Sequence, residues 1–284
     1  MADGISSARD IRLDDRVAIV TGAARGIGRT IAHALARAGA HVLYADIDGG
    51  ATGFATREVA GQKNCGRVLG VFCDITRSDD CKRTVEEAVR LFGRLDILVN
   101  NAGKGPVHLE TAPATRSLKF WEADADAWRD VIVTNVIGTF LMSHHAAPHL
   151  IASGARGRIL NVTTSLATMQ RRENSPYGVS KVAIEAETLI WAKDLAGTGV
   201  TCNSVLPGGA TDTDFVSAPT RADMRASGRT ILQPDIIVPP VLWLASDHAA
   251  GITGARYVGN IWDESLPLEQ AAAGAREPQV LREA

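Results

Sequence analysis

The sequence lacks the signatures of several large classes of protein. Its four cysteines form no CxxC pair and stand beside no histidine cluster, which argues against a zinc site or a disulfide framework. The 30 lysines and arginines are balanced by 32 aspartates and glutamates, so no basic surface for nucleic acid is expected. No apolar run approaches the roughly 18–20 residues of a membrane span, and residues 1–15 lack the pattern of a signal peptide. We therefore expect a soluble, cytoplasmic protein with no metal and with reduced thiols at Cys65, Cys73, Cys81 and Cys202.

Short apolar runs of strand length alternate with segments of helical periodicity along most of the chain. The runs are almost continuously apolar, which favours strands buried on both faces. The pattern predicts an α/β fold with a Rossmann-type, doubly wound parallel sheet of about seven strands and helices on both faces. We expect a single domain over residues 15–262 and a flexible arm over 1–14. The tail over 263–284 is expected to be exposed, with a docked arm as the alternative.

A glycine-rich turn joins the first predicted strand, residues 16–21, to the first predicted helix. Gly22, Gly26 and Gly28 let the backbone approach a ligand closely, and the start of the helix offers free N–H groups and a positive dipole end. Strand, turn and helix together are typical of a cradle for the pyrophosphate of a dinucleotide. The alternative is a tight turn that binds nothing.

Asp46 ends the second predicted strand, 24 residues after Gly22. A carboxylate at this point can accept hydrogen bonds from the ribose hydroxyls of an adenosine and would repel a 2′-phosphate. Because Ile47 rather than a basic residue follows, the sequence predicts NAD rather than NADP. Arg25 favours the opposite choice, since an arginine in this turn can hold a 2′-phosphate. The alternative role for Asp46 is to cap a helix.

Further polar residues follow other predicted strands. Asp74 comes after the third strand and Asn101 after the fourth. In a doubly wound sheet ligands bind beyond the carboxyl ends of the strands, so both residues are expected beside the glycine-rich turn. Asn135 lies on a long predicted helix over residues 128–150.

Tyr177 and Lys181 are four residues apart, so on a helix their side chains share one face. An ammonium near a phenol favours the phenolate and lowers the phenol's pKa, which is normally near 10. Such a phenol can protonate a forming alkoxide or deprotonate an alcohol. The alternative is a surface lysine beside a half-buried tyrosine.

Three histidines, His144, His145 and His149, share the predicted helix over 128–150. His145 and His149 are spaced to bind a metal from one helix face, but no carboxylate or third ligand accompanies them. We expect a role in packing or subunit contact instead.

Together these segments resemble the short-chain dehydrogenases/reductases of roughly 250 residues over nearly the whole chain. Residues 21–28 are similar to the family's TGxxxGxG turn, 100–103 to its NNAG, 177–181 to its YxxxK and 207–208 to its PG turn. The resemblance implies that Tyr177 exchanges a proton with the substrate oxygen. It implies that Lys181 lowers the pKa of Tyr177 and holds the nicotinamide ribose, and that Asn135 anchors a water. It also implies a cofactor-binding set made of Gly22, Arg25, Gly26, Ile27, Gly28, Asp46, Ile47, Asp74, Ile75, Asn101, Ala102, Gly103, Tyr177, Lys181, Pro207, Gly208, Thr211 and Thr213.

The sequence departs from the family pattern at the catalytic hydroxyl. The family places a serine thirteen residues before the tyrosine, where this chain has Thr164, and Ser165 follows it. We retain both as candidates and narrowly prefer Ser165, because the methyl group of threonine would crowd a substrate. Thr211 and Thr213 are both candidates for contact with the nicotinamide carboxamide, and we favour Thr213.

These residues predict an NAD-dependent oxidoreductase that interconverts a secondary alcohol and a ketone. A non-catalytic dinucleotide-binding regulator or scaffold, and a sugar epimerase on a related fold, remain as alternatives. Arg171 and Arg172 follow the fifth strand, and we hypothesise that one of them pairs with an anion on the substrate, although both side chains could instead be exposed to solvent. The polar segment 211–233 is typical of a lid, and the resemblance implies a homotetramer or homodimer.

Overall fold

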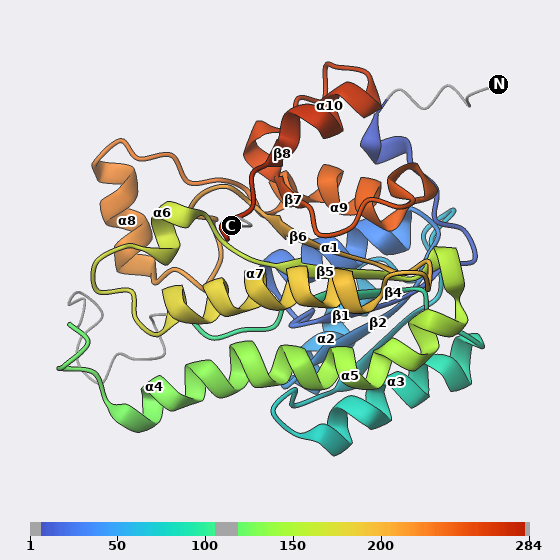
Figure 1. The fold of residues 1–284 in the computed structure, drawn as a ribbon, viewed down its shortest axis with the longest axis horizontal. Helices are drawn as coiled ribbons and strands as arrows, with labels where there is room; N and C mark the ends of the chain where they lie inside the picture. Colours follow the sequence, from blue (N-terminus) through green and yellow to red (C-terminus); the bar gives the residue numbers. More distant parts are fainter. Residues whose placement is uncertain (1–6, 106–118, 282–284) are drawn as a thin grey trace.

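The computed structural model describes residues 7–105 and 119–281 and is built on one eight-stranded sheet (Figure 1). The strands lie in the order β3-β2-β1-β4-β5-β6-β7-β8, and all neighbours are parallel except the antiparallel pair β7 and β8. Their bounds are β1 Val17–Thr21, β2 His41–Asp46, β3 Val68–Phe72, β4 Ile97–Asn100, β5 Arg158–Val162, β6 Thr201–Leu206, β7 Arg256–Val258 and β8 Arg276–Glu277. The predicted α/β fold is confirmed, with one strand more than expected.

Helices cover both faces of the sheet (Figure 1). One face carries α1 (Gly26–Arg37), α2 (Gly49–Arg57), α9 (Val238–Ala245) and α10 (Leu268–Ala275). The other face carries α3 (Ser78–Phe92), α5 (Gly138–Ala152) and α7 (Tyr177–Asp194). Shorter helices complete the fold: α4 (Ala125–Ile132), α6 (Leu166–Met169) and α8 (Ala218–Ala226). In residues 7–105 and 119–281, no helix has the length and apolar character needed to cross a membrane.

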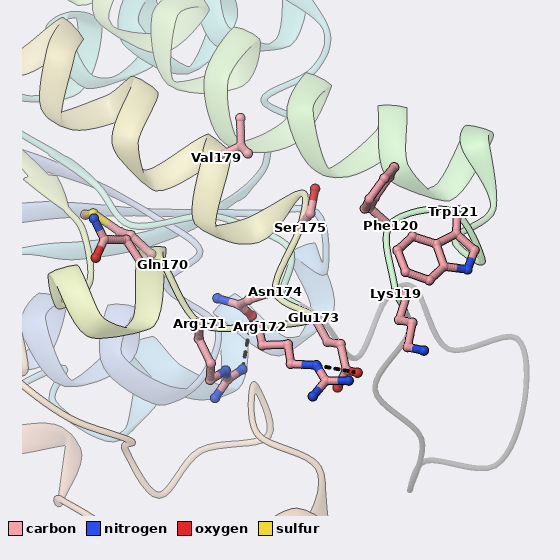
Figure 2. Close-up of a pocket in the computed structure, with 11 residues that line it drawn as sticks. Lys119, Phe120, Trp121, Gln170, Arg171, Arg172, Glu173, Asn174, Ser175 and Val179 are labelled. Carbon is pink, nitrogen blue, oxygen red and sulfur yellow. Dashed lines mark hydrogen bonds and ion pairs between the residues drawn. The ribbon is translucent and has the colours of Figure 1, made fainter.

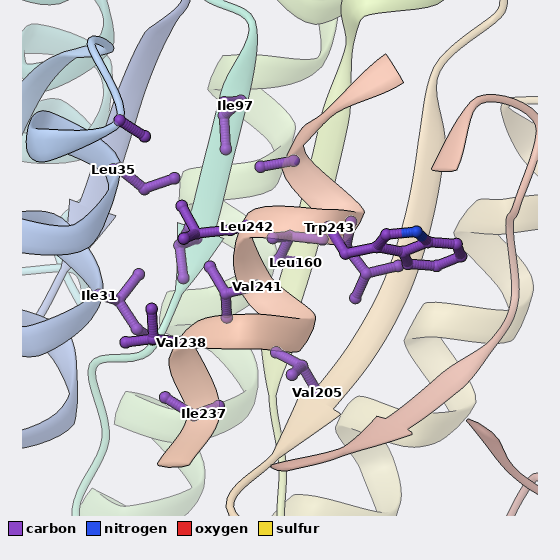
Figure 3. Close-up of a cluster of buried hydrophobic side chains, with 14 of the residues drawn as sticks. Ile31, Leu35, Ile97, Leu160, Val205, Ile237, Val238, Val241, Leu242 and Trp243 are labelled. Atoms are coloured by element: carbon purple, nitrogen blue, oxygen red, sulfur yellow. The ribbon is translucent and has the colours of Figure 1, made fainter. Parts of the chain in front are cut away.

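The central strands β1, β2 and β4 are largely apolar because their two faces contribute to two separate cores. In β1, Ala18 and Val20 belong to the core beneath α1 and α9, whereas Val17 and Ile19 belong to the core beneath α3 and α5. Figure 3 shows Val241 and Leu242 of α9 lying in the first core. Burying side chains of this size contributes about 1.5–3 kcal/mol each relative to leaving them exposed. The sheet is therefore a rigid platform for the residues at its carboxyl edge.

The helix predicted over residues 128–150 is interrupted. α4 ends at Ile132, the π-helical segment Val133–Ile137 follows, and α5 begins at Gly138. A π-helical turn inserts one extra residue per turn and is often found at functional sites. Here it contains Asn135, whose side chain is almost completely buried.

Both terminal segments pack more closely than the sequence suggested. Ala8, Ile11 and Leu13 are buried in the core beneath α1 and α9, although residues 1–14 were expected to be a loose arm. The expected exposed tail is wrong for α10 and β8, which lie against α9 and β7. The alanines of α10 supply too little hydropathy for a clear sequence signal, yet their small side chains allow close packing.

Candidate active site

The glycine-rich turn between β1 and α1 is tightly enclosed. Gly22 and Gly26 have φ values of +65° and +57°, a region that disfavours residues with a Cβ. A Cβ on Gly28 would lie 2.1 Å from the carbonyl oxygen of Gly22. Asn101, at the end of β4, closes the turn by donating from Nδ2 to the carbonyl oxygens of Thr21 (2.9 Å) and Gly22 (3.2 Å). Backbone therefore approaches backbone here at a distance that only glycine permits.

The start of α1 is open to an anionic ligand. Arg25 precedes the helix and makes no side-chain capping hydrogen bond, and the first turn carries no acidic residue. The side chain of Arg25 is exposed, whereas Ile27 packs against the core. The first N–H groups of a helix have no partner within the helix, and the dipole places partial positive charge there. This end of α1 is therefore suited to a phosphate group.

Asp46 supports the turn from the end of β2. Its Oδ2 accepts a hydrogen bond from the N–H of Ala24 (3.0 Å), and its Oδ1 accepts one from the N–H of Asp48 (3.0 Å). The helix-capping role considered for Asp46 belongs to Asp48, whose Oδ1 accepts from the N–H of Ala51 (2.9 Å) at the start of α2. Ile47 is 62% exposed beside the turn.

Asp74 and Ile75 follow β3 at the same edge. Asp74 Oδ1 accepts hydrogen bonds from the N–H (3.0 Å) and the hydroxyl (2.7 Å) of Thr76. Ile75 is buried against α5, where a Cβ on Gly138 would lie 2.7 Å from its side chain. The two residues thus extend the edge that begins at the glycine-rich turn.

Asn135 connects the loop after β4 to the start of α7. Its Oδ1 accepts from the N–H of Lys104 (2.7 Å), and its Nδ2 donates to the carbonyl oxygen of Lys104 (3.0 Å) and to Ser180 Oγ (2.9 Å). Gly103 must be small, since a Cβ there would lie 3.0 Å from Asn135 Oδ1. Ala102 is fixed by its N–H, which donates to the hydroxyl of Thr21 (3.1 Å). The amide of Asn135 is therefore fully engaged in positioning two segments of the site.

Tyr177 and Lys181 are buried on the first turns of α7. Burial raises the pKa of Tyr177 to about 12, and a hydrogen bond with Thr164 and the charge of Arg171 act in the opposite direction. Lys181 Nζ donates to the carbonyl oxygen of Val162 (2.8 Å) and lies 5.8 Å from the centre of the Tyr177 ring. Burial lowers the pKa of Lys181 to about 8. The expectation of a lowered phenol pKa is therefore not met, because removal from water outweighs the nearby charges.

The two candidate hydroxyls have different neighbours. Thr164 is close enough to Tyr177 for its hydroxyl to act on the phenol and lower the pKa of Tyr177. Ser165 caps α6: its Oγ accepts from the N–H of Thr168 (3.2 Å) and lies 2.9 Å from the hydroxyl of that residue. The geometry thus favours Thr164 over the preferred Ser165. The methyl group of Thr164 therefore does not exclude this residue from the site. The hydroxyl of Ser165 is engaged at the start of α6 instead.

The turn after β6 lies opposite the glycine-rich turn. Gly208 follows Pro207 with φ +94°, and a Cβ there would lie 1.9 Å from Asn260 Oδ1. Thr211 is buried and donates to the carbonyl oxygen of Gly209 (3.3 Å). Thr213 reaches the turn after β1: a Cβ on Gly26 would lie 3.3 Å from Thr213 Cγ2. Of the two threonines, Thr213 is therefore the one beside the proposed cofactor cradle.

Phe215 is a site residue that the sequence did not reveal. Its ring centre lies 5.4 Å from that of Tyr177. A Cβ on Gly105 would lie 2.5 Å from the Phe215 ring, so the ring fills the space between the loop after β4 and the phenol. The one signal in the sequence that could have indicated Phe215 is that it is the lone aromatic residue in the polar segment 211–233.

A cavity of about 370 Å³ opens beside the first turn of α7 (Figure 2). Phe120 and Trp121 form part of its wall, with their rings edge to face at 5.0 Å. Arg171 donates to Asn174 Oδ1 (3.0 Å), whereas Arg172 pairs with the carboxylate of Glu173 (3.3 Å) and its side chain is 80% exposed. The cavity is lined by Lys119, Phe120, Trp121, Met169, Gln170, Arg171, Arg172, Glu173, Asn174, Ser175 and Val179.

The histidines of α5 lie away from this edge. His145 Nε2 is 2.9 Å from the hydroxyl of Ser78 on α3, and the ring of His144 lies 5.6 Å from that of Phe140. Within residues 7–105 and 119–281, no three histidine, cysteine or acidic side chains are grouped as metal ligands would be.

Comparison with known proteins gives consistent matches over most of the chain. Residues 16–223 match the family model described as short chain dehydrogenase. The chain is 36% identical to cis-4-hydroxycyclohexanecarboxylate dehydrogenase from Sinomonas cyclohexanicum, over 85% of this chain and 93% of that protein. It is 31% identical to D-threitol dehydrogenase from Mycolicibacterium smegmatis, over 88% and 93% of the two chains.

A solved structure shares the fold as well. It is described as an NAD(P)-dependent gluconate 5-dehydrogenase from Beutenbergia cavernae with bound NADP, and it superposes with a TM-score of 0.76. Its sequence is 30% identical, and the match covers 88% of this chain and 97% of that one.

Substitution of the two hydroxyl residues tests their roles directly. Thr164→Val removes the hydroxyl beside Tyr177 while keeping the side-chain shape, and we expect kcat/KM for dinucleotide-linked alcohol oxidation to fall about 10²-fold or more. Ser165→Ala removes only the α6 cap and should leave most of kcat/KM. Steady-state kinetics measure both, with thermal unfolding as a control for folding. Equal losses in the two variants would contradict the assignment.

Proposed function

This chain belongs to the short-chain dehydrogenase family, and we propose that it is a cytoplasmic, NAD(H)-dependent enzyme that interconverts a secondary alcohol and a ketone. The observation that carries the proposal is the meeting of Tyr177, Thr164 and Lys181 at the carboxyl edge of the sheet. A phenol, a hydroxyl and an ammonium in this arrangement can move one proton to or from a substrate oxygen. The glycine-rich turn lies at the same edge.

The residues around that turn fit a nicotinamide dinucleotide. Gly28 lets α1 approach the turn closely, since a Cβ there would clash with the carbonyl oxygen of Gly22, and the uncapped start of α1 is suited to the pyrophosphate. Asp46 and Asp74 stand at neighbouring strand ends, suited to the adenosine, and Thr213 lies beside Gly26. When bound, the cofactor accepts or supplies the hydride.

The side chains of this protein would handle the proton. With its pKa raised to about 12, the phenol of Tyr177 is protonated at neutral pH, which is the form that donates to a ketone oxygen during reduction. Alcohol oxidation requires the phenolate, so its rate should rise with pH above neutrality. Thr164 would donate a hydrogen bond to the same oxygen, and the Lys181 ammonium would stabilise the phenolate.

A non-catalytic dinucleotide-binding regulator is the alternative from another class. Burying the phenol of Tyr177 beside the ammonium of Lys181 is unfavourable, and binding alone does not require the phenol. Their presence favours the enzyme.

The decisive experiment monitors reduced nicotinamide by absorbance across secondary alcohols, polyols, hydroxy acids and steroids. We expect turnover with at least one class, an oxidation rate that increases above pH 7 until the Lys181 ammonium, with its pKa of about 8, loses its proton, and loss of turnover in Tyr177→Phe. Retained dinucleotide binding in Tyr177→Phe serves as the folding control. Binding without turnover in the wild type would favour the regulator.

Asp46 supports the choice of NAD over NADP, because its carboxylate would repel a 2′-phosphate. Asp46→Asn keeps an acceptor for Ala24 but removes the charge, and we expect kcat/KM for NAD relative to NADP to fall about tenfold. The matched control is Asp48→Asn, which removes a charge two residues away and should leave the ratio unchanged. A wild-type enzyme that prefers NADP would contradict the proposal and would indicate that Arg25 holds the 2′-phosphate.

Arg171 supports an anionic substrate such as a hydroxy acid. Its guanidinium lines the cavity, and its charge lowers the pKa of Tyr177, which places it within electrostatic reach of the phenol. One similar protein is named for a substrate that carries a carboxylate. Arginine binds carboxylates through two parallel hydrogen bonds.

We expect Arg171→Gln to raise KM for a hydroxy acid about tenfold and to leave KM for a neutral alcohol unchanged. Arg172→Gln is the matched control, because Arg172 is exposed and paired with Glu173. Neutral alcohols that turn over as efficiently as hydroxy acids, with no change in Arg171→Gln, would disprove this substrate class.

We also propose a homodimer or homotetramer. Phe140, Ile151, Val179 and Ile190 on α5 and α7 are 44–55% exposed, and these four residues define the α5–α7 surface. Exposed apolar patches of this kind are typical of subunit contacts. Light scattering should give a multiple of 30.1 kDa, and Ile190→Glu should reduce it. Phe54→Glu, on α2, is the control, and a wild type of 30.1 kDa at every concentration would contradict the proposal.

A further inference from the structure

A buried arginine stands directly behind the candidate proton-transfer groups. Arg256 is the first residue of β7, and its side chain is only 1% exposed. Its Nη1 donates to Glu185 on α7, and its Nη2 donates to the carbonyl oxygen of Thr164 (3.0 Å). Its Nε donates to Glu277 on β8 (3.3 Å). One planar guanidinium therefore joins α7, the end of β5 and the C-terminal strand.

Glu185 is as deeply buried as Arg256 and is fully paired. It lies one helical turn after Lys181, and its carboxylate also accepts hydrogen bonds from the hydroxyls of Thr163 (2.6 Å) and Ser204 (3.0 Å). Two buried charges are expensive to desolvate, and apolar residues of similar size are often at least as stable. Stability alone is therefore a poor explanation for this pair.

We propose that Arg256 is a positioning residue, which holds Thr164 at the distance from Tyr177 that proton transfer requires. Because its Nε binds Glu277, the position of Thr164 then depends on the docking of β8. The inference rests on the proposed function, in which Thr164 and Tyr177 act on the substrate oxygen. A displacement of about 1 Å at such a site can lower a rate by about 10²-fold.

Only an arginine can make this set of contacts. The guanidinium presents donors in a fixed fork, so hydrogen bonds to Glu185 and Glu277 determine where Nη2 points. An ammonium in the same place would neutralise Glu185 but could not hold the carbonyl of Thr164 and Glu277 at fixed angles. Charge and geometry can therefore be separated by Arg256→Lys.

The test compares full-length variants by kinetics and by NMR. Arg256→Lys retains the charge and loses the fork, and Glu277→Ala removes the partner on β8. Arg276→Ala is the matched control, because Arg276 is the exposed neighbour on the same strand. The chain contains three tyrosines, so selective labelling with ¹³C at Cζ gives three resonances. The resonance that is lost in Tyr177→Phe is that of Tyr177. Thr164→Val provides the reference for the lost hydrogen bond.

We expect Arg256→Lys to lower kcat about tenfold or more, with unchanged affinity for the dinucleotide. Its Tyr177 resonance should move toward that of Thr164→Val. Glu277→Ala should change both measurements in the same direction by less, and Arg276→Ala should match the wild type. A wild-type kcat and resonance in Arg256→Lys would overturn the proposal, as would identical behaviour of Glu277→Ala and Arg276→Ala.

The NMR arm separates this inference from the proposed function. A shifted Tyr177 resonance in a protein that turns over no substrate would retain the positioning role while removing the enzyme assignment. Normal turnover with an unshifted Tyr177 resonance in Arg256→Lys would remove the positioning role and retain the enzyme assignment.

Discussion

Tyr177 and Lys181 are held out of water at the carboxyl edge of the sheet, and their desolvation sets requirements that the surrounding residues meet. Burial disfavours the charged form of each group, which raises the pKa of the phenol and lowers that of the ammonium. Each polar atom therefore needs a partner. The end of β5 supplies the carbonyl oxygen of Val162, which accepts from Lys181, and the next segment brings the hydroxyl of Thr164 close enough to Tyr177 to lower the pKa of the phenol. The position of this one strand end relative to α7 thus controls the chemistry available to the site.

Asparagine amides hold together the segments of the site that lack regular structure. Asn101 fixes the glycine-rich turn, and Asn135 fixes Lys104 and Ser180. Asn100 continues this pattern below the edge, where its Nδ2 donates to Ser143 Oγ and Asn161 Oδ1 at 2.9 Å. An amide both donates and accepts, so it can satisfy two backbone groups of a turn where a carboxylate could only accept. These links place the loops without a ligand.

The fold and most strand ends were predictable because the signals are local. Apolar runs mark the strands, and glycines mark the turn after β1, where sterics permit little else. The choice between Thr164 and Ser165 was not predictable, since it depends on which hydroxyl caps the short helix α6. Phe215 and Arg256 were missed for a similar reason: each acquires its role from partners distant in sequence. The sequence also indicated the wrong sign for the pKa of Tyr177, because spacing reveals a neighbouring charge but not the depth of burial.

The antiparallel pairing of β8 with β7 has a consequence for the sheet as a whole. A parallel sheet that ended at β7 would present unpaired N–H and C=O groups along that strand, and such an edge is a template for strands from other molecules. β8 covers it with a two-residue strand whose side chains, Arg276 and Glu277, are both charged. The C-terminal segment thereby protects the sheet against extension into a neighbouring chain on this side.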